Sequence, residues 1–454
     1  MYEKVLDLLE ERNFKAIREL FRDMNEADVA ALLQRFYDDG DIEGHQHIVL
    51  FRLLNKDVAA DVFAYMDSDM QKLLIESFTD NELREVIDDL YVDDTVDIIE
   101  EMPANVVSRI LRSADAATRS EINQLLKYPK DSAGSVMTTE YVYLKKDYTA
   151  REALEAIRHI GVVKETVYTL YVTESRVLIG VLSLLDLITA DEEDKIEDIM
   201  QTNIISVNTL EDREIVASQM AKYDFAAMPV VDNDNRLVGI ITYDDAMDVL
   251  QEETTEDFSK MAAVAPSDES YFKTSVFAHA KNRIMWLLVL MLSATLTGAI
   301  VNKYQAAFAA VPVLVSFLSM LSGTGGNCGS QTSTLVIRGM ALGEKQMRDF
   351  FKVLFKELRV AIVCGVILSV VNAGRIILVY RNNKTVDCYK LAFTVSGAIL
   401  LTVVLSKLIA AMLPMIAKKL RLDPAIMAAP LITTIVDTCS TLMFFALATV
   451  VFGL

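Results

Sequence analysis

The sequence predicts a multidomain protein, of class α plus α/β, that ends in a membrane domain. Its expected parts are an acidic superhelix of short helices, a duplicated α/β module, a connecting helix and five membrane-spanning helices. Three observations predict this order. Acidic residues are concentrated before residue 274, a pattern of about 60 residues occurs twice between residues 135 and 252, and long uncharged runs recur after residue 280. A run of about 20 apolar residues is long enough to cross a bilayer.

Charge is divided unequally between the two parts of the chain. The 454 residues carry a formal net charge of −20. Residues 274–454 contain 6 acidic and 17 basic residues, whereas residues 1–273 contain 58 and 27, a net charge of −31. A surface this acidic repels nucleic acids and anionic lipids and attracts cations. We therefore expect no nucleic-acid partner.

Residues 1–131 predict a superhelix of short, stacked helices. Apolar residues recur three and four positions apart, as in Leu83, Val86 and Ile87, which is the period of an amphipathic helix. Weakly similar short units follow one another, which is typical of stacked helical repeats. Acids crowd the opposite face, and for most of them a solvated helix face is the expected role. The segment begins without the apolar core of a signal peptide, so we expect it in the cytosol.

Residues 132–197 and 198–253 contain the duplicated module. The first copy ends "RVLIGVLSLLDLI" and the second "RLVGIITYDDAMDVL". Each copy predicts a strand, a helix, further strands and a final helix. In both copies a glycine is followed by a hydroxyl and an acid at intervals of three: Gly180, Ser183, Asp186 and Gly239, Thr242, Asp245. This pair resembles a tandem CBS module, in which these positions hold nucleotide hydroxyls and phosphates. Helix capping by Ser183 and Thr242 is the structural alternative.

Residues 254–280 predict a connector that begins as a helix, breaks near Pro266 and resumes into the membrane half. A connector between a soluble module and a membrane domain transmits motion or acts as a passive tether, and the sequence leaves both open.

Residues 281–454 predict five spans, at 284–302, 304–337, 360–380, 391–417 and 425–454. The second run has 34 uncharged residues, too many for one straight span, and Pro312 and a cluster of glycines divide it. Basic residues cluster before span one and after spans two and four. The positive-inside rule then places the N-terminal domains in the cytosol and the C-terminus outside the cell membrane.

The glycine cluster lies in the segment "GTGGNCGSQ", residues 323–331. Glycines at membrane depth predict an unwound helix whose carbonyl oxygens point at an ion, with Asn327 and Gln331 as further oxygen ligands. Close helix packing through small residues is the alternative. It accounts for the glycines but not for the two amides.

Asp437 is a lone carboxylate near the middle of the last apolar segment, and Thr433 lies one turn before it on the same helix face. Burying a charge in a bilayer costs about 2.5–3.5 kcal/mol on insertion scales, so such a carboxylate predicts a cation pathway. Capping a neighbouring helix or pairing with a basic residue is the alternative. Oxygen ligands favour Mg²⁺, Ca²⁺ or Mn²⁺, and a two-fold dimer would bring two such carboxylates together around a hydrated ion.

Motifs of common enzymes and zinc sites are absent from the sequence. The cysteines Cys328, Cys364, Cys388 and Cys439 form no CxxC pair. The chain contains no GxSxG, HExxH or P-loop motif, so we expect that it is not an enzyme.

The order of these parts, with "GTGGNCGSQTSTLVIRGMALGE" and "DPAIMAAPLITTIVD", resembles the MgtE family of magnesium channels over essentially the whole chain. The resemblance implies uptake of Mg²⁺ by a homodimer in the lipid bilayer, a pore lined by spans two and five, and closure when cytosolic Mg²⁺ is high. The pore residues that it implies are Asp437, Asn327, Gly326 and Thr433.

The resemblance also implies acids that sense Mg²⁺. In the superhelix they are Asp61 and Asp93. In the second CBS copy and the connector they are Glu214, Asp224, Asp245, Asp248, Glu253, Glu256 and Asp257.

Tyr168, Asp186 and Phe225 match the family's nucleotide-binding positions, so ATP is the implied second ligand. The sequence departs from the family at two places. Leu185 replaces a basic residue that would help to bind ATP, and Ser440 stands where the family usually has a glycine three residues after the pore aspartate.

Two other classes of membrane protein remain alternatives. An ion-coupled secondary transporter of divalent cations would show flux that follows a proton or sodium gradient. Asp437 is the only acid predicted well inside a span, which argues against this class. A signalling scaffold would show no conductance, and would not need Asn327, Gln331 and Asp437 at membrane depth.

Overall fold

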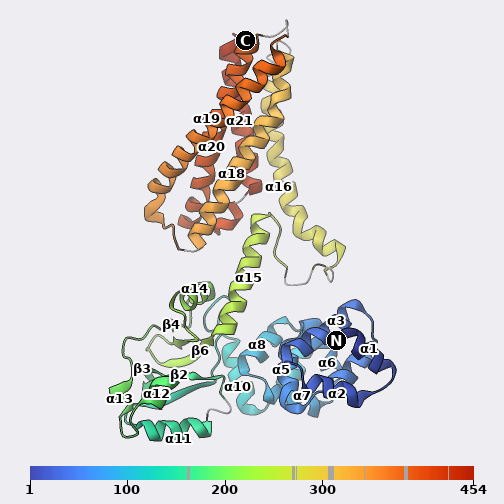
Figure 1. The fold of residues 1–454 in the computed structure, drawn as a ribbon, viewed down its shortest axis with the longest axis vertical. Coiled ribbons are helices and arrows are strands. Elements are labelled where there is room, and N and C mark those ends of the chain that lie inside the picture. Colours follow the sequence, from blue (N-terminus) through green and yellow to red (C-terminus); the bar gives the residue numbers. More distant parts are fainter. Residues whose placement is uncertain are drawn as a thin grey trace. The chain divides into compact units, whose positions relative to one another are not determined.

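The computed structural model describes residues 1–160, 164–267, 271, 274–304, 311–341, 343–382, 387–427 and 429–453. These residues form two compact units, Met1–Gln251 and Glu252–Leu454 (Figure 1). Each unit is considered by itself below.

The first part of the first unit is a row of short helices. They are α1 (Tyr2–Glu10), α2 (Phe14–Arg22), α3 (Glu26–Asp39), α4 (Gly44–Phe51), α5 (Lys56–Ala64), α6 (Ser68–Ser77), α7 (Asp80–Asp89), α8 (Val92–Glu101), α9 (Ala104–Ser113) and α10 (Ala116–Leu125). Side chains such as Asn13, Thr79 and Asp115 accept hydrogen bonds from backbone N–H groups at helix N-termini, which fixes where these helices begin. Helix α3 packs against α5, α5 against α7 and α7 against α9. The predicted superhelix of stacked helices is therefore confirmed.

The apolar face of these helices forms the core of the unit. Leu83, Val86 and Ile87 of α7 are buried together with aromatic residues such as Phe63 and Phe78. The three-and-four spacing read from the sequence thus marks the buried side of the row.

The second part of the first unit contains two three-stranded sheets (Figure 1). The first copy contains β1 (Tyr141–Lys145), α11 (Ala150–Ile160), β2 (Thr166–Glu174), β3 (Val177–Ser183), α12 (Leu184–Thr189) and α13 (Ile196–Ile199). The second contains β4 (Val207–Asn208), α14 (Arg213–Tyr223), β5 (Ala227–Val231), β6 (Leu237–Thr242) and α15 (Tyr243–Met261). In each sheet the first strand pairs parallel with the second, and the second pairs antiparallel with the third. The predicted duplication is confirmed.

The matched glycines of the two copies mark where the copies pack together. A methyl group added to Gly180 would collide with Met200, and one added to Gly239 would collide with Met137. Each glycine therefore leaves room for the methionine that opens the other copy, and the interface between the copies requires both.

Helix α15 carries the chain from the first unit into the second. It begins at Tyr243 and ends at Met261, so the boundary predicted between residues 253 and 254 lies inside one continuous helix. The residues that follow, up to 267, are not helical, in agreement with the predicted break near Pro266.

The second unit is a bundle of long helices. They are α16 (Val276–Lys303), α18 (Leu318–Ala341), α19 (Phe350–Tyr380), α20 (Cys388–Lys419) and α21 (Ala429–Phe452), with 3-10 turns η2 (Pro312–Phe317), η3 (Met347–Asp349) and η4 (Pro424–Met427). In the described part of the chain four stretches are long and apolar enough to cross a membrane: Val276–Lys303, Met347–Tyr380, Cys388–Lys419 and Pro424–Phe452. Helix α18 packs against α20 and α21 as the fifth long helix, and its many small and polar residues lower its hydropathy.

Candidate cation sites

Asp437 lies near the middle of α21 and faces α18. Ser322 of α18 donates a hydrogen bond from Oγ to Asp437 Oδ1 at 2.5 Å. Asp437 is half-buried, and among the residues that the structure describes no Lys or Arg forms an ion pair with it. The alternative roles of Asp437, a helix cap or the partner of a basic residue, therefore have no support in these residues.

The glycine cluster does not unwind α18, and that prediction is wrong. The helix is continuous from Leu318 to Ala341, and its glycines let α21 approach closely. A methyl group on Gly325 would lie 2.7 Å from Val436 Cγ1, and one on Gly326 would lie 2.8 Å from Thr433 Cγ2. Gly329 faces Ile432 in the same way, at 2.7 Å. The alternative, packing through small residues, is what the structure has.

These contacts fix the register between α18 and α21. Ser322 lies opposite Asp437, and Gly326 lies opposite Thr433, so four residues forward on one helix correspond to four residues back on the other. The two helices are therefore antiparallel, and the two pairs are about 6 Å apart, the rise of four helical residues. Three of the four predicted pore residues, Asp437, Thr433 and Gly326, thus lie along one contact line.

Asn327 lies on a different face of α18. Gly323, Asn327 and Gln331 are all exposed and are spaced four residues apart, so they form a polar stripe along the helix. No hydrogen bond joins Asn327 to Asp437 within the described chain. In the single chain this stripe is therefore separate from the contact line on α21.

Ser440, one of the two departures from the family pattern, is buried beside Gly325. Its exposed fraction is 1%, and its Oγ would lie 3.5 Å from a methyl group on Gly325. Within the described residues this Oγ has no hydrogen-bond partner, and neither does Thr402 Oγ1 on the other side of Gly325. Two unpartnered hydroxyl groups therefore lie close to Gly325.

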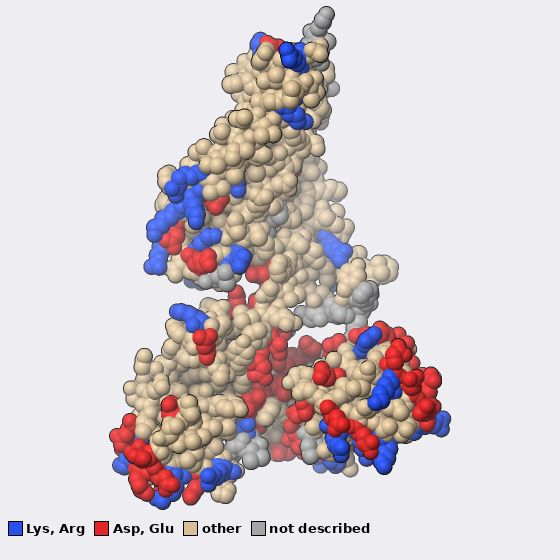
Figure 2. Space-filling model, in the orientation of Figure 1, with Lys and Arg blue, Asp and Glu red and all other residues tan. Residues whose placement is uncertain are grey.

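The first unit contains buried acids where the superhelix meets the CBS module. Asp93 of α8 is 6% exposed, and its Oδ1 has no partner among the described residues. Glu140 and Glu165 each have one buried carboxylate oxygen without a hydrogen-bond partner among the described residues. The backbone N–H of Glu165 donates to the Glu140 carbonyl at 3.0 Å. We call these residues, with Asp94 and Asp245, the carboxylate cluster. Figure 2 shows how many acidic side chains lie on this unit.

Burial is the main cause of raised pKa values in the carboxylate cluster, and repulsion between its members adds to it. Burial and the neighbouring Asp94 raise the pKa of Asp93 to about 7. Burial and repulsion by Asp245 raise that of Asp94 to about 7, and burial and repulsion by Asp93 raise that of Glu165 to about 9. Asp245 accepts a hydrogen bond from Thr242 Oγ1, yet burial still raises its pKa to about 7. Five acids held this close are costly to ionise together.

No three of the described His, Cys, Asp or Glu side chains lie in an arrangement that could hold a metal ion by direct ligation. Sequence reasoning found Asp93 and Asp245 but missed Glu140 and Glu165, since isolated acids at strand ends carry no periodic signal.

The remaining predicted sensor acids are spread over several elements. Glu214 lies in the first turn of α14, and Asp224 is the C-terminal cap of this helix, with a positive φ of 55°. Asp61 is on α5, where burial and then repulsion by Glu26 raise its pKa. Asp248 and Glu253 follow Asp245 along α15.

In the second unit the end of α15 contacts the loop before η4. Lys260 Nζ lies 2.7 Å from Glu256 Oε1 and 2.6 Å from Asp423 Oδ2. Burial, and next the Asp423 carboxylate, raise the pKa of Asp257. Asp423 and Lys260 were not predicted. They join the predicted acids Glu256 and Asp257 to the segment that leads into α21.

The predicted nucleotide residues lie on β2, on α12 and in the loop between α14 and β5, and no hydrogen bond or ring contact joins them in the described chain. Tyr168 of β2 is 71% exposed. Ser183 Oγ donates to Asp186 Oδ2 at 2.6 Å and accepts from Asp186 N at 3.0 Å, so this pair caps α12. Phe225 stacks on Tyr223, with ring centroids 5.5 Å apart.

Comparison with known proteins places all parts of the chain in one family. Residues 318–447 match the MgtE family, described as a divalent cation transporter. Residues 24–131 match the MgtE intracellular N domain, and residues 133–193 and 196–252 match the CBS domain.

Two relatives are similar over nearly their whole length. The magnesium transporter MgtE of Thermus thermophilus is 34% identical over 448 residues, 97% of this chain and 96% of its own. The magnesium transporter MgtE of Bacillus subtilis is 32% identical, over 98% of this chain and 96% of its own.

Two solved structures resemble the N-terminal half. One is the cytosolic domain of the Mg²⁺ channel MgtE in complex with ATP, with a TM-score of 0.51 and 35% identity over 55% of this chain and all of that chain. The other is the soluble part of a magnesium transporter, with a TM-score of 0.50 and 30% identity over 56% of this chain and 97% of that chain. On these matches the chain belongs to the MgtE family of divalent cation transporters, a family of membrane proteins that are not enzymes.

Proposed function

We propose that this protein is a Mg²⁺-selective channel that takes magnesium into the cell, and that cytosolic Mg²⁺ closes it. The relatives named magnesium transporters support Mg²⁺ as the cargo. The observation that carries the proposal is the single carboxylate Asp437, at the middle of α21, held by Ser322 on the tightly packed α18.

The site at Asp437 suits a hydrated ion. One carboxylate, the hydroxyl of Thr433 and the carbonyl groups near the start of α21 provide oxygen atoms only. The Thr433 hydroxyl donates to the Pro430 carbonyl at 2.8 Å, which leaves the lone pairs of its oxygen for a water molecule of the ion's hydration shell. Such a site binds Mg²⁺ weakly enough to release it, as conduction requires.

A homodimer is supported by the polar stripe of α18. Gly323, Asn327 and Gln331 are exposed in the single chain. Amides are expensive to expose to lipid, so this face requires cover by protein or water. A second copy related by a two-fold axis would cover it and would place two Asp437 side chains and two Asn327 side chains around one pathway.

Closure by Mg²⁺ is supported by the carboxylate cluster. The carboxylates of the cluster repel one another, and this repulsion opposes the packing of the superhelix against the CBS module. A divalent ion would offset this repulsion and favour the compact arrangement, because a ligand stabilises the state that binds it. Asp245 of the cluster lies in the first turn of helix α15, which continues as one helix into the second unit, where Lys260 joins it to Asp423. Mg²⁺ bound at one end of α15 would thus act on the segment that precedes α21.

The sign of the surface charge supports an orientation with both soluble parts in the cytosol and the C-terminus outside. Basic residues lie near the N-terminal ends of α16 and α19, which the positive-inside rule places on the cytosolic side. In this orientation the membrane potential would drive Mg²⁺ inward.

The test is Mg²⁺ flux into liposomes that contain the full-length protein, with the Mg²⁺ concentration on the cytosolic side varied. We expect flux at micromolar Mg²⁺ and closure at millimolar Mg²⁺, together with protection of the residues after Met261 from limited proteolysis. Flux that does not depend on cytosolic Mg²⁺ would contradict the gating, and absence of flux at every concentration would contradict the channel.

A specific observation favours coupled transport as the second candidate. Lys407 of α20 is 5% exposed, and its Nζ donates to Thr332 Oγ1 at 3.1 Å. Thr332 in turn donates to Glu357 of α19 at 3.1 Å. Glu357 lies on α19 just before the predicted span 360–380, so Asp437 remains the only acid predicted well inside a span. Buried ionisable chains of this kind carry protons in coupled transporters. Mg²⁺ flux that reverses with an imposed proton gradient, at zero membrane potential, would favour this candidate.

A further inference from the structure

The carboxylate of Asp437 has two oxygen atoms, and the described residues treat them differently. Ser322 Oγ donates to Asp437 Oδ1 at 2.5 Å, a length typical of a hydroxyl that donates to an ionised carboxylate. The other oxygen, Oδ2, accepts no hydrogen bond from the described part of the chain. One oxygen is therefore occupied by the protein, and the other is left for an ion or for the water around it.

Contacts on two sides of α21 keep this carboxylate beside the serine hydroxyl. On the α18 side, Gly326 packs so closely that an added methyl group would lie 2.8 Å from Thr433 Cγ2. On the α16 side, the residue after Asp437 is Thr438, whose Oγ1 lies 2.9 Å from Thr297 Oγ1. These contacts oppose any rotation of α21 that would carry the carboxylate away from the hydroxyl.

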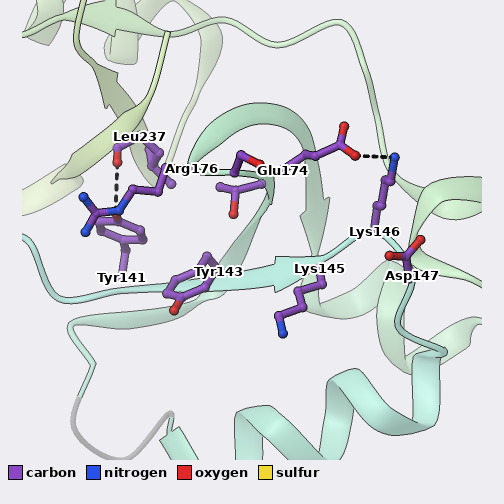
Figure 3. A pocket seen from close by; sticks show the side chains of 10 residues that line it. Tyr141, Tyr143, Lys145, Lys146, Asp147, Glu174, Arg176 and Leu237 are labelled. Carbon is purple, nitrogen blue, oxygen red and sulfur yellow. Dashed lines mark hydrogen bonds and ion pairs between the residues drawn. The ribbon is translucent and has the colours of Figure 1, made fainter. Parts of the chain in front are cut away.

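A hydroxyl partner differs from a basic partner, because it occupies a carboxylate oxygen without cancelling the charge. Figure 3 shows the contrasting case, in a pocket of the first CBS copy. There Lys146 Nζ lies 2.6 Å from Glu174 Oε1, so the charge of the carboxylate is compensated. Ser322 instead leaves the negative charge of Asp437 to attract a cation, while it takes away one of the two oxygen atoms that could bind it.

The number of available carboxylate oxygens affects the choice between Ca²⁺ and Mg²⁺. Ca²⁺ takes about six to eight oxygen ligands in flexible arrangements and binds carboxylates through one oxygen or through both. Mg²⁺ demands an octahedral shell and usually keeps several of its waters, so it needs only one oxygen of a carboxylate, or contact through water. A carboxylate with a single available oxygen therefore disfavours the binding of Ca²⁺ more than that of hydrated Mg²⁺.

We propose that Ser322 is a specificity-determining residue, which limits Asp437 to one available oxygen and so weakens the binding of Ca²⁺ relative to that of Mg²⁺. The inference rests on the proposed function, in which Asp437 contacts the transported ion. Ser322 acts on the ion through Asp437, so it is a positioning residue. Without its hydroxyl the carboxylate can turn and bind Ca²⁺ through both oxygens, and Ca²⁺ held in this way obstructs the passage of Mg²⁺.

The test is inhibition by Ca²⁺ of Mg²⁺ flux into liposomes that contain the full-length protein, at micromolar Mg²⁺ on the cytosolic side. Ser322→Ala removes the donor, and we expect half-maximal inhibition at a Ca²⁺ concentration lowered by about tenfold, the size of effect that a hydrogen bond to a charged group has on an equilibrium constant. Ser322→Cys should shift the inhibition in the same direction, because a thiol is only a weak donor. Ser322→Thr keeps the hydroxyl and should resemble the parent protein.

Thr297→Val is the matched control, since it removes a hydroxyl that contacts α21 one residue further along and leaves the Ser322 hydroxyl in place. It should leave the inhibition by Ca²⁺ unchanged. Inhibition like that of the parent in both Ser322→Ala and Ser322→Cys would overturn the inference. An equal shift in Thr297→Val would also overturn it, because the effect would then belong to helix packing. Absence of Mg²⁺ flux in the parent protein would instead contradict the proposed function, and this inference with it.

Discussion

The contact line of Asp437, Thr433 and Gly326, which we call the pore line after its proposed role, and the carboxylate cluster use the same chemical group in opposite ways. At the pore line a single carboxylate, Asp437, accepts a hydrogen bond from the hydroxyl of Ser322. In the cluster five carboxylates lie close together, and Asp93, Glu140 and Glu165 each leave an oxygen without a partner. Figure 2 shows the same contrast at a coarser level, because the surface of the second unit is mostly uncharged whereas acids are frequent on the first.

Under the proposed function, this difference would let one ion be both cargo and signal. A single carboxylate attracts a hydrated ion without holding it, which suits passage. A crowded set of carboxylates is destabilised by its own repulsion, so an ion that enters it changes the free energy of the whole arrangement, which suits regulation. The following predictions would break or sharpen this contrast.

The largest expected effect is on Mg²⁺ flux, and it should differ between variants of the pore line and variants of the carboxylate cluster. Asp437→Ala should lower Mg²⁺ flux in liposomes by at least about a hundredfold, because it removes the charge that attracts the ion. Asp93→Asn combined with Glu165→Gln should keep the maximal flux and weaken the inhibition by cytosolic Mg²⁺. Equal loss of flux in both variants would remove the distinction between cargo site and sensor.

Packing of the pore line should give the next largest effect. Gly326→Val would push a side chain into Thr433, and overpacking of this kind costs about 1–3 kcal/mol. We expect a lower melting temperature in detergent together with reduced flux. Gly374→Val is the control, since Gly374 of α19 has no atom within 4 Å of an added methyl group, and it should have much less effect.

The cluster should make stability depend on pH when divalent ions are removed by a chelator. The pKa values of Asp93 and Asp245 are raised to about 7, so these acids favour the folded state while they are protonated. This contribution is present at low pH and is lost as the pH rises through about 7. The loss runs from about pH 4, where the unfolded acids ionise, to about pH 7, and stability should be level above that pH. Between pH 6 and pH 8 each of the two acids contributes a loss of about 1.4 kcal/mol, about 3 kcal/mol together, measured by thermal unfolding, and saturating Mg²⁺ should remove most of it.

Asp93→Asn provides the control for this dependence, because an amide cannot ionise and keeps the shape of the side chain. The pH profile of this variant should be flatter than that of the parent protein. A steeper profile, or one that saturating Mg²⁺ leaves unchanged, would show that the cluster is not the source.

The smallest effect should come from the contact at the end of α15. Lys260 balances Glu256 and Asp423, so Lys260→Met leaves acids that a cation can bridge. We expect half-maximal inhibition of flux at a Mg²⁺ concentration lowered by about fivefold, since exposed ion pairs are worth about 1 kcal/mol or less. Lys195→Met, which removes a comparable lysine paired with Glu197 in the first CBS copy, should leave the inhibition unchanged.

The candidate site was predicted in part, and particular residues show where prediction stopped. The spacing of Thr433 and Asp437 on one helix face follows from the period of the helix alone. Their partners do not, because Ser322 is 115 residues away from Asp437 in the chain. Gly325 and Gly326 gave a wrong prediction, because a glycine read without its neighbours is compatible both with an unwound helix and with close packing.

The sequence by itself determined the order of the parts, the duplicated module, the membrane-length segments and the unequal charge. These features depend on local composition and on periods of two to four residues, which a chain carries before it folds. Only the tertiary structure decided that the glycines of α18 receive α21, that Ser322 holds Asp437, and that Glu140 and Glu165 join Asp93 in one buried cluster. The physical reason is that packing and burial are properties of contacts between distant residues, and those contacts exist only once the helices and sheets have been brought together.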